Sequence, residues 1–144
     1  DLVRSRGLGD VYKRQSLADC YVSLHRSEGF GLTMAESMFL GKPVIATNYS
    51  GNLDFMNHEN SYLVDCDLVK VGLGDYPYAW GNFWAEPDIG QAAELMKYVY
   101  ENREEAFAKG KKGKEKIEKE YNAKKIAELI EQRVEFINNN LMVK

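Results

Sequence analysis

Three short apolar segments alternate with helical segments in the first half of the chain, and this alternation limits the fold more than any other feature. Strands are expected at residues 20–25, 44–47 and 61–64. Helical segments are expected at 33–40 and again up to about residue 56. Such alternation is typical of a doubly wound sheet with helices on both faces. We therefore predict an α/β fold with a partial Rossmann-like parallel sheet flanked by helices.

Local signals mark both ends of the first helix. Thr33 stands where an N-cap residue is expected, and Glu36 three positions later completes a capping box. Gly41 can adopt a left-handed conformation, and Pro43 just beyond it cannot continue the helix. The sequence thus predicts a helix that starts at Thr33 and ends before Gly41.

An aromatic-rich insertion at residues 66–87 interrupts the alternation. Its rings belong to Tyr76, Tyr78, Trp80, Phe83 and Trp84. We interpret them as a small satellite core of the same domain. The alternative is stacking on a saccharide acceptor, because rings offer flat apolar faces to sugars. Asp88 can cap a helix that runs to about residue 100, which completes an α/β domain over 16–100, and C-terminal helices are predicted over 101–144.

The first fifteen residues show neither helical nor alternating periodicity. Residues 10–15, DVYKRQ, resemble the translation of a transposon-end adapter used to prepare sequencing libraries. We interpret residues 1–15 as a non-native, adapter-derived segment and expect the biological sequence to begin near Ser16. On this interpretation the chain is the C-terminal fragment of a longer protein.

Charge and hydropathy exclude several classes of protein. Residues 16–100 carry four Lys/Arg against eleven Asp/Glu, which disfavours a general nucleic-acid-binding surface. The lysine-rich run 109–114 is followed at once by glutamates, so we interpret it as a solvated helix face. No apolar run approaches the roughly 18 residues of a membrane span. We expect a cytoplasmic protein with reduced Cys20 and Cys66, and peripheral contact with the inner membrane face is left open.

The stretch that says most about function is EGFGLTMAE, residues 28–36. Two carboxylates, Glu28 and Glu36, bracket a glycine-rich turn and the start of a helix. The glycines let the backbone approach a ligand, and the free amides of residues 32–34 form an anion site that the helix dipole reinforces. A phosphate there would leave both carboxylates free to accept hydrogen bonds from hydroxyl groups. We therefore expect both acids to face one hollow.

Residues 18–64, with EGFGLTMAE, the GKPVIAT strand and NSYLV, resemble the C-terminal domain of retaining glycosyltransferases of family 4 (group 1 glycosyltransferases), which adopt the GT-B fold. The similarity extends through WAEPD at 84–88 into the helix beyond. The resemblance implies transfer of a sugar from a nucleoside-diphosphate donor to an acceptor hydroxyl, with retention at the anomeric carbon. The nucleoside-diphosphate sugar is a substrate, and we expect no cofactor and no metal in addition to it.

The resemblance also implies a role for each residue of the motif. Glu28 would be the catalytic residue that contacts the donor sugar near the reacting carbon, and Glu36 would bind the ribose hydroxyls. Donor-sugar and phosphate binding would fall to the turn between them, at Gly29, Phe30, Gly31, Leu32 and Thr33.

Other parts of the family's machinery have no match before Ser16. The family uses an Arg/Lys pair on the diphosphate and an N-terminal domain that binds the saccharide or glycolipid acceptor. We therefore expect an enzyme in the full-length parent and an inactive fragment here. A stand-alone, non-catalytic sugar-nucleotide or phosphate-binding module is the alternative. A nicotinamide-dependent oxidoreductase is disfavoured, because Met34 occupies the third glycine position of a dinucleotide fingerprint.

Two further patterns receive a structural interpretation. His25 at a strand end is expected to be a packed or hydrogen-bonded residue rather than a catalytic base. Asp65-Cys66-Asp67 resembles a metal-binding Asp-x-Asp but is interpreted as a solvated strand exit, so no metal site is predicted.

Overall fold

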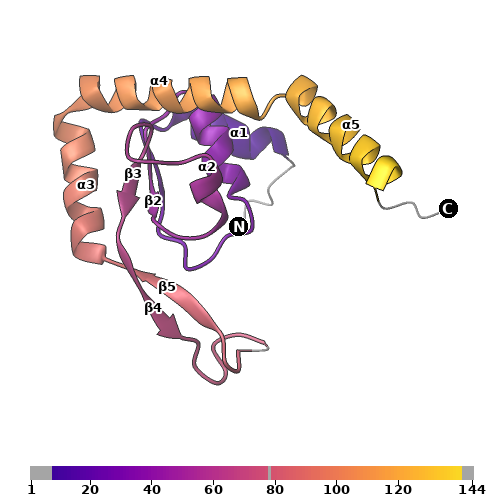
Figure 1. The fold of residues 1–144 in the computed structure, drawn as a ribbon. Coiled ribbons are helices and arrows are strands. Elements are labelled where there is room, and N and C mark those ends of the chain that lie inside the picture. The colour runs from indigo at the N-terminus through magenta and orange to yellow at the C-terminus, as the bar shows by residue number, and fades with distance from the viewer. Residues whose placement is uncertain (1–7, 78, 141–144) are drawn as a thin grey trace.

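The structure is a computed structural model that describes residues 8–77 and 79–140. Three parallel strands and their helices form the body of the molecule, from which a two-stranded hairpin and the last helix project (Figure 1). The elements in chain order are α1 (Leu8–Leu17), β1 (Tyr21–Ser23), α2 (Leu32–Phe39), β2 (Val44–Thr47), the 3₁₀ helix η1 (Gly51–Asp54), β3 (Tyr62–Val64), β4 (Cys66–Lys70), β5 (Phe83–Pro87), α3 (Ile89–Glu101), α4 (Arg103–Glu120) and α5 (Ala123–Asn140).

The sheet has the order β1-β2-β3, and both pairings are parallel. Side chains of β2 alternate between the faces: Val44 and Ala46 pack with α2, while Ile45 packs with α3. All four residues of β2 are buried, which accounts for its continuous apolar sequence. The predicted α/β fold is thus confirmed, with a parallel sheet consistent with a partial Rossmann-like arrangement.

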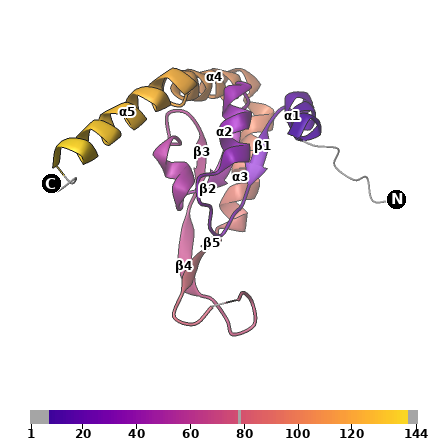
Figure 2. The ribbon, with the colours of Figure 1, turned by 90° about the vertical axis from the view of Figure 1, so that its right-hand side faces the viewer.

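Each face of the sheet is covered by its own cluster of apolar side chains. On one face α2, the segment after η1 and α4 contribute Met34, Met38, Phe55, Met56 and Ile117. On the other face α3 and the start of α4 contribute Ala92, Val99 and Ala106. The sheet therefore lies between two helical layers (Figures 1 and 2).

The start of α2 differs from the predicted capping box. Gly31 is the N-cap residue, with a left-handed φ of 91°, and no side chain caps the helix. Thr33 lies inside the helix, where its Oγ1 accepts a hydrogen bond of 2.9 Å from the Tyr21 hydroxyl. Because α2 already begins at Leu32, Thr33 cannot cap it, and its hydroxyl links α2 to β1 instead. The predicted end is confirmed, because Gly41 has a left-handed φ of 73°.

Helix α1 was not predicted from the sequence. Gln15 is buried against α2, and its Nε2 donates a hydrogen bond of 3.2 Å to the carbonyl oxygen of Thr33. In the sequence, Leu8, Val11 and Tyr12 follow helical spacing, so the expectation that residues 1–15 lack helical periodicity is wrong for this segment. Residues 1–7 lie outside the described residues, and the adapter origin of 1–15 stays a prediction.

The insertion forms an antiparallel hairpin in which Cys66 pairs with Pro87 and Lys70 with Phe83. Its base is closed by a hydrogen bond of 2.8 Å from the Asp88 amide to the Asp65 carbonyl oxygen. Asp65 follows β3 and is exposed, as is Asp67, which agrees with the interpretation of Asp65-Cys66-Asp67 as a solvated strand exit; Cys66 already begins the next strand, β4.

The predicted satellite core does not form in the hairpin. The exposed fractions are 66% for Tyr76, 87% for Trp80 and 51% for Phe83. The hairpin extends away from the sheet and its helices, so few neighbouring groups can cover these rings (Figures 1 and 2). Tyr78 lies outside the described residues.

The three C-terminal helices agree with their predicted positions. Asp88 caps α3, since its Oδ1 accepts a hydrogen bond of 2.9 Å from the Gln91 amide. Helix α4 runs across one end of the sheet, and α5 continues beyond it with its apolar residues exposed (Figure 1). Over residues 8–77 and 79–140, every helix is too short or too polar to cross a membrane.

We predict that Gly110→Ala destabilises the fold through the packing of α4 on the loop after α2. A Cβ at this buried position would lie 2.5 Å from the Gly41 carbonyl oxygen and 2.9 Å from the Pro43 nitrogen. Because backbone atoms cannot move aside cheaply, we expect a loss of about 1–2 kcal/mol in the free energy of unfolding, despite alanine's better helix propensity. Urea denaturation followed by circular dichroism measures this loss.

Gly90→Ala in α3 is the matched control. Its Cβ would meet only the Asp88 side chain, at 3.2 Å, so the expected change in stability is small or favourable. Equal stability of the Gly110→Ala and wild-type proteins would contradict the close packing of α4.

Candidate functional site

The turn that carries Glu28 is held against the loop after β2. The Glu28 amide donates a hydrogen bond of 2.9 Å to Ser50 Oγ, and the Gly51 amide donates one of 3.2 Å to the Glu28 carbonyl oxygen. A Cβ at Gly51 would overlap the carbonyl group of Gly29, so only glycine permits this approach. Two loops that follow neighbouring parallel strands therefore form one rigid unit.

A buried asparagine joins the same two strand ends. His25 Nε2 lies 3.0 Å from the Tyr49 carbonyl oxygen and 3.1 Å from Asn52 Oδ1, so this nitrogen carries the proton and donates. Asn52 is fully buried, and its Nδ2 donates to the Thr47 carbonyl oxygen at 3.1 Å. His25 is thus the hydrogen-bonded structural residue that the sequence predicts. Asn52 was missed, because nothing in its local sequence separates it from an ordinary turn residue.

Phe30 anchors the turn on its other side. Its ring lies 5.1 Å from that of Phe55 and 5.8 Å from that of Tyr121, measured between centroids. The Tyr121 hydroxyl donates to the Asp54 carbonyl oxygen at 3.1 Å, which holds this aromatic group against η1. The Phe30 side chain is therefore committed to packing, and its backbone is the part that can serve a ligand.

The start of α2 keeps the amides that an anion site needs. Over the described residues, the N–H groups of Leu32, Thr33 and Met34 donate to no other group of the chain. The first helical bond is that of the Ala35 amide to the Gly31 carbonyl oxygen, at 3.0 Å. The free amides and the helix dipole make this end of α2 attractive to a phosphate. Thr33 also keeps the proton of its hydroxyl as a donor, since that hydroxyl only accepts the hydrogen bond from Tyr21.

The two predicted acids face different hollows. Glu28 and Gly29 line a hollow of about 650 Å³ whose opposite wall is the β4–β5 hairpin. Glu36 lines another of about 450 Å³, together with Phe30 and Leu32 and with residues of α4 and α5. The expectation of one shared hollow is therefore wrong. Phe30 and Tyr121, which pack together, both line the second hollow. The start of the turn thus lines one hollow and its end lines the other.

Both carboxylates are unused by the fold. Glu28 and Glu36 are half-buried, and within residues 8–77 and 79–140 their carboxylate oxygens have no hydrogen-bond or ion-pair partner. The capping role that offers a structural explanation for Glu36 is not realised, because Gly31 caps α2 without a side chain. Half-buried, unpaired carboxylates at the two ends of an amide-rich turn are available to accept hydrogen bonds from a ligand.

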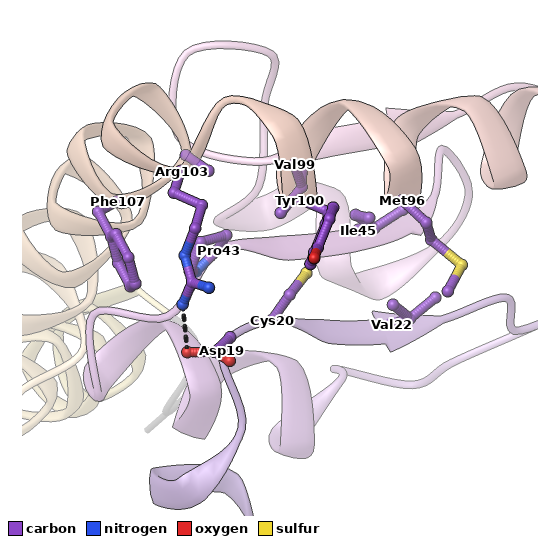
Figure 3. A pocket seen from close by; sticks show the side chains of 11 residues that line it. Asp19, Cys20, Val22, Pro43, Ile45, Met96, Val99, Tyr100, Arg103 and Phe107 are labelled. Atoms are coloured by element: carbon purple, nitrogen blue, oxygen red, sulfur yellow. Dashed lines mark hydrogen bonds and ion pairs between the residues drawn. The ribbon is translucent and has the colours of Figure 1, made fainter.

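Other hollows contain none of the predicted site residues. One of about 220 Å³ lies between the sheet and α3 and α4; it is lined mostly by apolar side chains and closed on one side by the 2.9 Å ion pair of Arg103 and Asp19 (Figure 3). Another, at the base of the hairpin, gathers Asp65, Asp67 and Glu86. Among the described residues, no group of three or more His, Cys, Asp and Glu is arranged to hold a metal ion.

Comparison with known proteins relates this chain to enzymes of sugar transfer. Residues 4–71 match the family of glycosyl transferases group 1. A protein of Acidianus filamentous virus 1 (isolate United States/Yellowstone), named ORF313 and described provisionally as a glycosyltransferase, is 31% identical over 99 residues. That alignment covers 67% of this chain and 30% of the viral protein, so the chain spans less than a third of its relative's length.

We predict that Cys20, in the hollow of Figure 3, reacts slowly as a thiol. Burial, and then the nearby charge of Asp19, raises its pKa from 9.0 to about 11, which leaves roughly a hundredfold less thiolate at pH 8. A Cys66→Ser variant, in which Cys20 is the remaining cysteine, should react with Ellman's reagent much more slowly when folded than in denaturant. Equal rates in the two states would contradict this environment of Cys20.

Proposed function

We propose that this chain is the donor-binding part of a retaining glycosyltransferase, which transfers a sugar from a nucleoside diphosphate to an acceptor hydroxyl. One observation carries the proposal. The glycine turn that matches the glycosyltransferase motif leads into a helix with free amides, and an unpaired carboxylate lies at each end of it. The match to glycosyl transferases group 1 supports the same chemistry.

The amides of Leu32, Thr33 and Met34 are proposed to hold the diphosphate. Three N–H donors and the positive end of α2 suit an anion, and they lie midway along the motif. The left-handed Gly31 lets the chain turn into α2 against the core, since a Cβ there would lie 2.6 Å from the Met34 side chain, and the three amides follow directly after this turn.

The two hollows suit an extended ligand. A nucleoside-diphosphate sugar has its diphosphate in the middle, with the sugar on one side and the ribose on the other. We assign the sugar to the hollow of Glu28 and the ribose to that of Glu36. Each carboxylate then accepts hydrogen bonds from hydroxyl groups at its own end, and this arrangement does not require the acids to face each other.

The proposed reaction makes one bond and breaks one. The acceptor oxygen bonds to the anomeric carbon on the face from which the diphosphate leaves, and the carbon–oxygen bond to the diphosphate breaks with its electron pair on the departing oxygen. The acceptor's proton passes to the released diphosphate. Glu28 is proposed to orient the sugar, and the helix amides to stabilise the charge that develops on the leaving group. The donor is a substrate, and no metal or further cofactor is invoked.

We also propose that the chain alone does not catalyse transfer. Arg26, the cation that lines the Glu28 hollow, is paired with Glu86 at 2.7 Å and is not free to stabilise a second phosphate charge. The same pairing favours the alternative of a non-catalytic sugar-nucleotide-binding module. In the full-length parent we place the protein in the cytoplasm, with an acceptor bound by another domain and with peripheral membrane contact left open.

We predict that Glu36→Gln weakens the binding of a nucleoside diphosphate about tenfold, because charge-assisted hydrogen bonds to the ribose are lost. Isothermal titration of the chain with UDP, GDP and ADP measures this loss. Glu28→Gln should leave the affinity for the diphosphate unchanged and weaken only that for the matching nucleotide sugar. Glu59→Gln, at an exposed turn, is the control. If the Glu36→Gln and Glu59→Gln proteins bound the nucleoside diphosphate with equal affinity, Glu36 would not bind the ribose.

The purified chain should release no nucleoside diphosphate above the rate of spontaneous hydrolysis when given nucleotide sugars and a neutral oligosaccharide. The physical reason is that Arg26, the cation that lines the Glu28 hollow among the described residues, is already paired with Glu86. Chromatographic detection of the released diphosphate tests this, and measurable transfer to the oligosaccharide would contradict it. In the full-length parent, Glu28→Gln should then lower turnover while the fold stays intact.

A further inference from the structure

Aromatic side chains of the β4–β5 hairpin line the Glu28 hollow without being used by the protein's own core. Tyr76 and Phe83 lie at this hollow and are largely exposed, and Trp84 beside them is half-buried. Large apolar groups left in water around a concave surface are typical of binding sites rather than of packing. These rings lie across the hollow from Glu28, the candidate catalytic carboxylate, and a bound ligand would explain why they stay exposed there.

The hairpin is tied to the Glu28 turn, so the wall has a defined place. The Ala85 amide donates a hydrogen bond of 2.9 Å to the Arg26 carbonyl oxygen, and the Arg26 guanidinium pairs with Glu86 at 2.7 Å. The same guanidinium lies 4.6 Å from the centre of the Trp84 ring. Three contacts with one residue, two positions before Glu28, therefore position the aromatic wall relative to the carboxylate.

The hollow has two kinds of surface. Tyr76, Phe83 and Trp84 contribute aromatic surface, and Arg26, Ser27 and Glu28 contribute polar groups, with the Arg26 guanidinium lying next to Trp84. A pyranose ring has the same two-sided character. Its axial C–H groups are weakly positive and suit the negative face of an aromatic ring, while its hydroxyl groups form hydrogen bonds around the rim.

The charges favour a neutral ligand. Among the described residues that line it, Glu28 carries a negative charge, and the positive charge of Arg26 is already paired with Glu86. An anion placed in this hollow would meet net negative charge, and the free helix amides that suit an anion belong to the start of α2. A volume of about 650 Å³ is also larger than one sugar ring needs.

We propose that the hollow between the Glu28 turn and the β4–β5 hairpin also binds the end of the neutral saccharide acceptor that lies next to the donor sugar, while another domain binds the rest of the acceptor. A sugar ring of the acceptor stacks on the aromatic wall with its hydroxyl groups directed to Arg26, and Glu28 is left to the donor sugar. The role as acceptor rests on the proposed function, whereas saccharide binding itself does not. The hairpin is then a recognition element of the site, and Arg26 is a positioning residue that holds it.

Tryptophan fluorescence tests this binding directly. The chain has two tryptophans, and Trp80 does not line the hollow. In a Trp80→Phe protein, Trp84 is therefore the single reporter. Titration with maltotetraose, cellotetraose, mannotetraose and chitotetraose, without nucleotide, should give a saturable change in emission for at least one of them. No saturable change with any of the four would overturn the proposal.

Variants in the same background test the aromatic wall. Phe83→Ala and Tyr76→Ala should each weaken the binding about fivefold or more, because each removes a stacking surface. Phe83→Tyr, which keeps the ring, should restore the affinity. Leu73→Ala is the matched control, since Leu73 is an exposed apolar residue of the same hairpin that does not line the hollow. Equal weakening by Leu73→Ala would overturn the assignment of the wall.

A second titration separates this inference from the proposed function. If nucleoside diphosphate binds in a Glu36-dependent way and no saccharide does, the acceptor site fails and the proposed function stands. If saccharide binds in a Phe83-dependent way and no diphosphate does, the saccharide site stands and its role as an acceptor site falls. A nucleotide sugar that alone changes Trp84 emission, while free oligosaccharides do not, would assign the wall to the donor and overturn the proposal.

Discussion

The buried side chain of Asn52 is the constraint on which the candidate site depends. Its Oδ1 accepts a hydrogen bond from His25, which lies just after β1, and its Nδ2 donates one to the carbonyl oxygen of Thr47, the last residue of β2. A buried amide left unpaired costs free energy, so the two bonds hold the strand ends in one arrangement. The Glu28 turn follows the first of these strands and rests on the loop after the second. Its position is thus set by the sheet and not by its own flexible sequence.

From this fixed turn the arrangement of the site follows. The aromatic group of Phe30, Phe55 and Tyr121 holds the side of the turn toward Glu36, and Arg26 ties its other side to the hairpin. Between these two anchors the backbone amides at the start of α2 stay free. Contacts within the protein thus fix both flanks of the turn and leave three amides unpaired in the middle, where the proposed diphosphate lies.

The parts of the fold that could be predicted are those whose burial leaves a local pattern. β2 is apolar throughout because both of its faces are covered, and Gly41 is needed for its left-handed φ. Helix α1 was missed because its pattern is short: Leu8, Val11 and Tyr12 follow helical spacing, but the next position of that series is the polar Gln15, which bonds to α2. The capping box failed because the left-handed Gly31 starts α2 at Leu32, so Thr33 lies inside the helix and bonds to Tyr21 of β1.

The site divides in the same way. The glycine turn and its two carboxylates could be predicted from nine consecutive residues, whereas their separation into two hollows could not. The partners that shape those hollows are distant in the chain: His25 and Asn52 are 27 positions apart, and Arg26 and Glu86 are 60 apart. The aromatic insertion was visible in the sequence, but its exposure depends on the hairpin extending away from the core, which no local pattern encodes.

The hairpin leaves and rejoins the body of the protein at almost the same point. Cys66 pairs with Pro87, and Asp65 is bonded to Asp88, directly between the last strand of the sheet and α3. Next to this base, Trp84, Ala85 and Glu86 contact Arg26, and the hairpin beyond them extends away from the sheet. That outer part of the hairpin can therefore lengthen, shorten or change its residues without moving the sheet, the glycine turn or its helix.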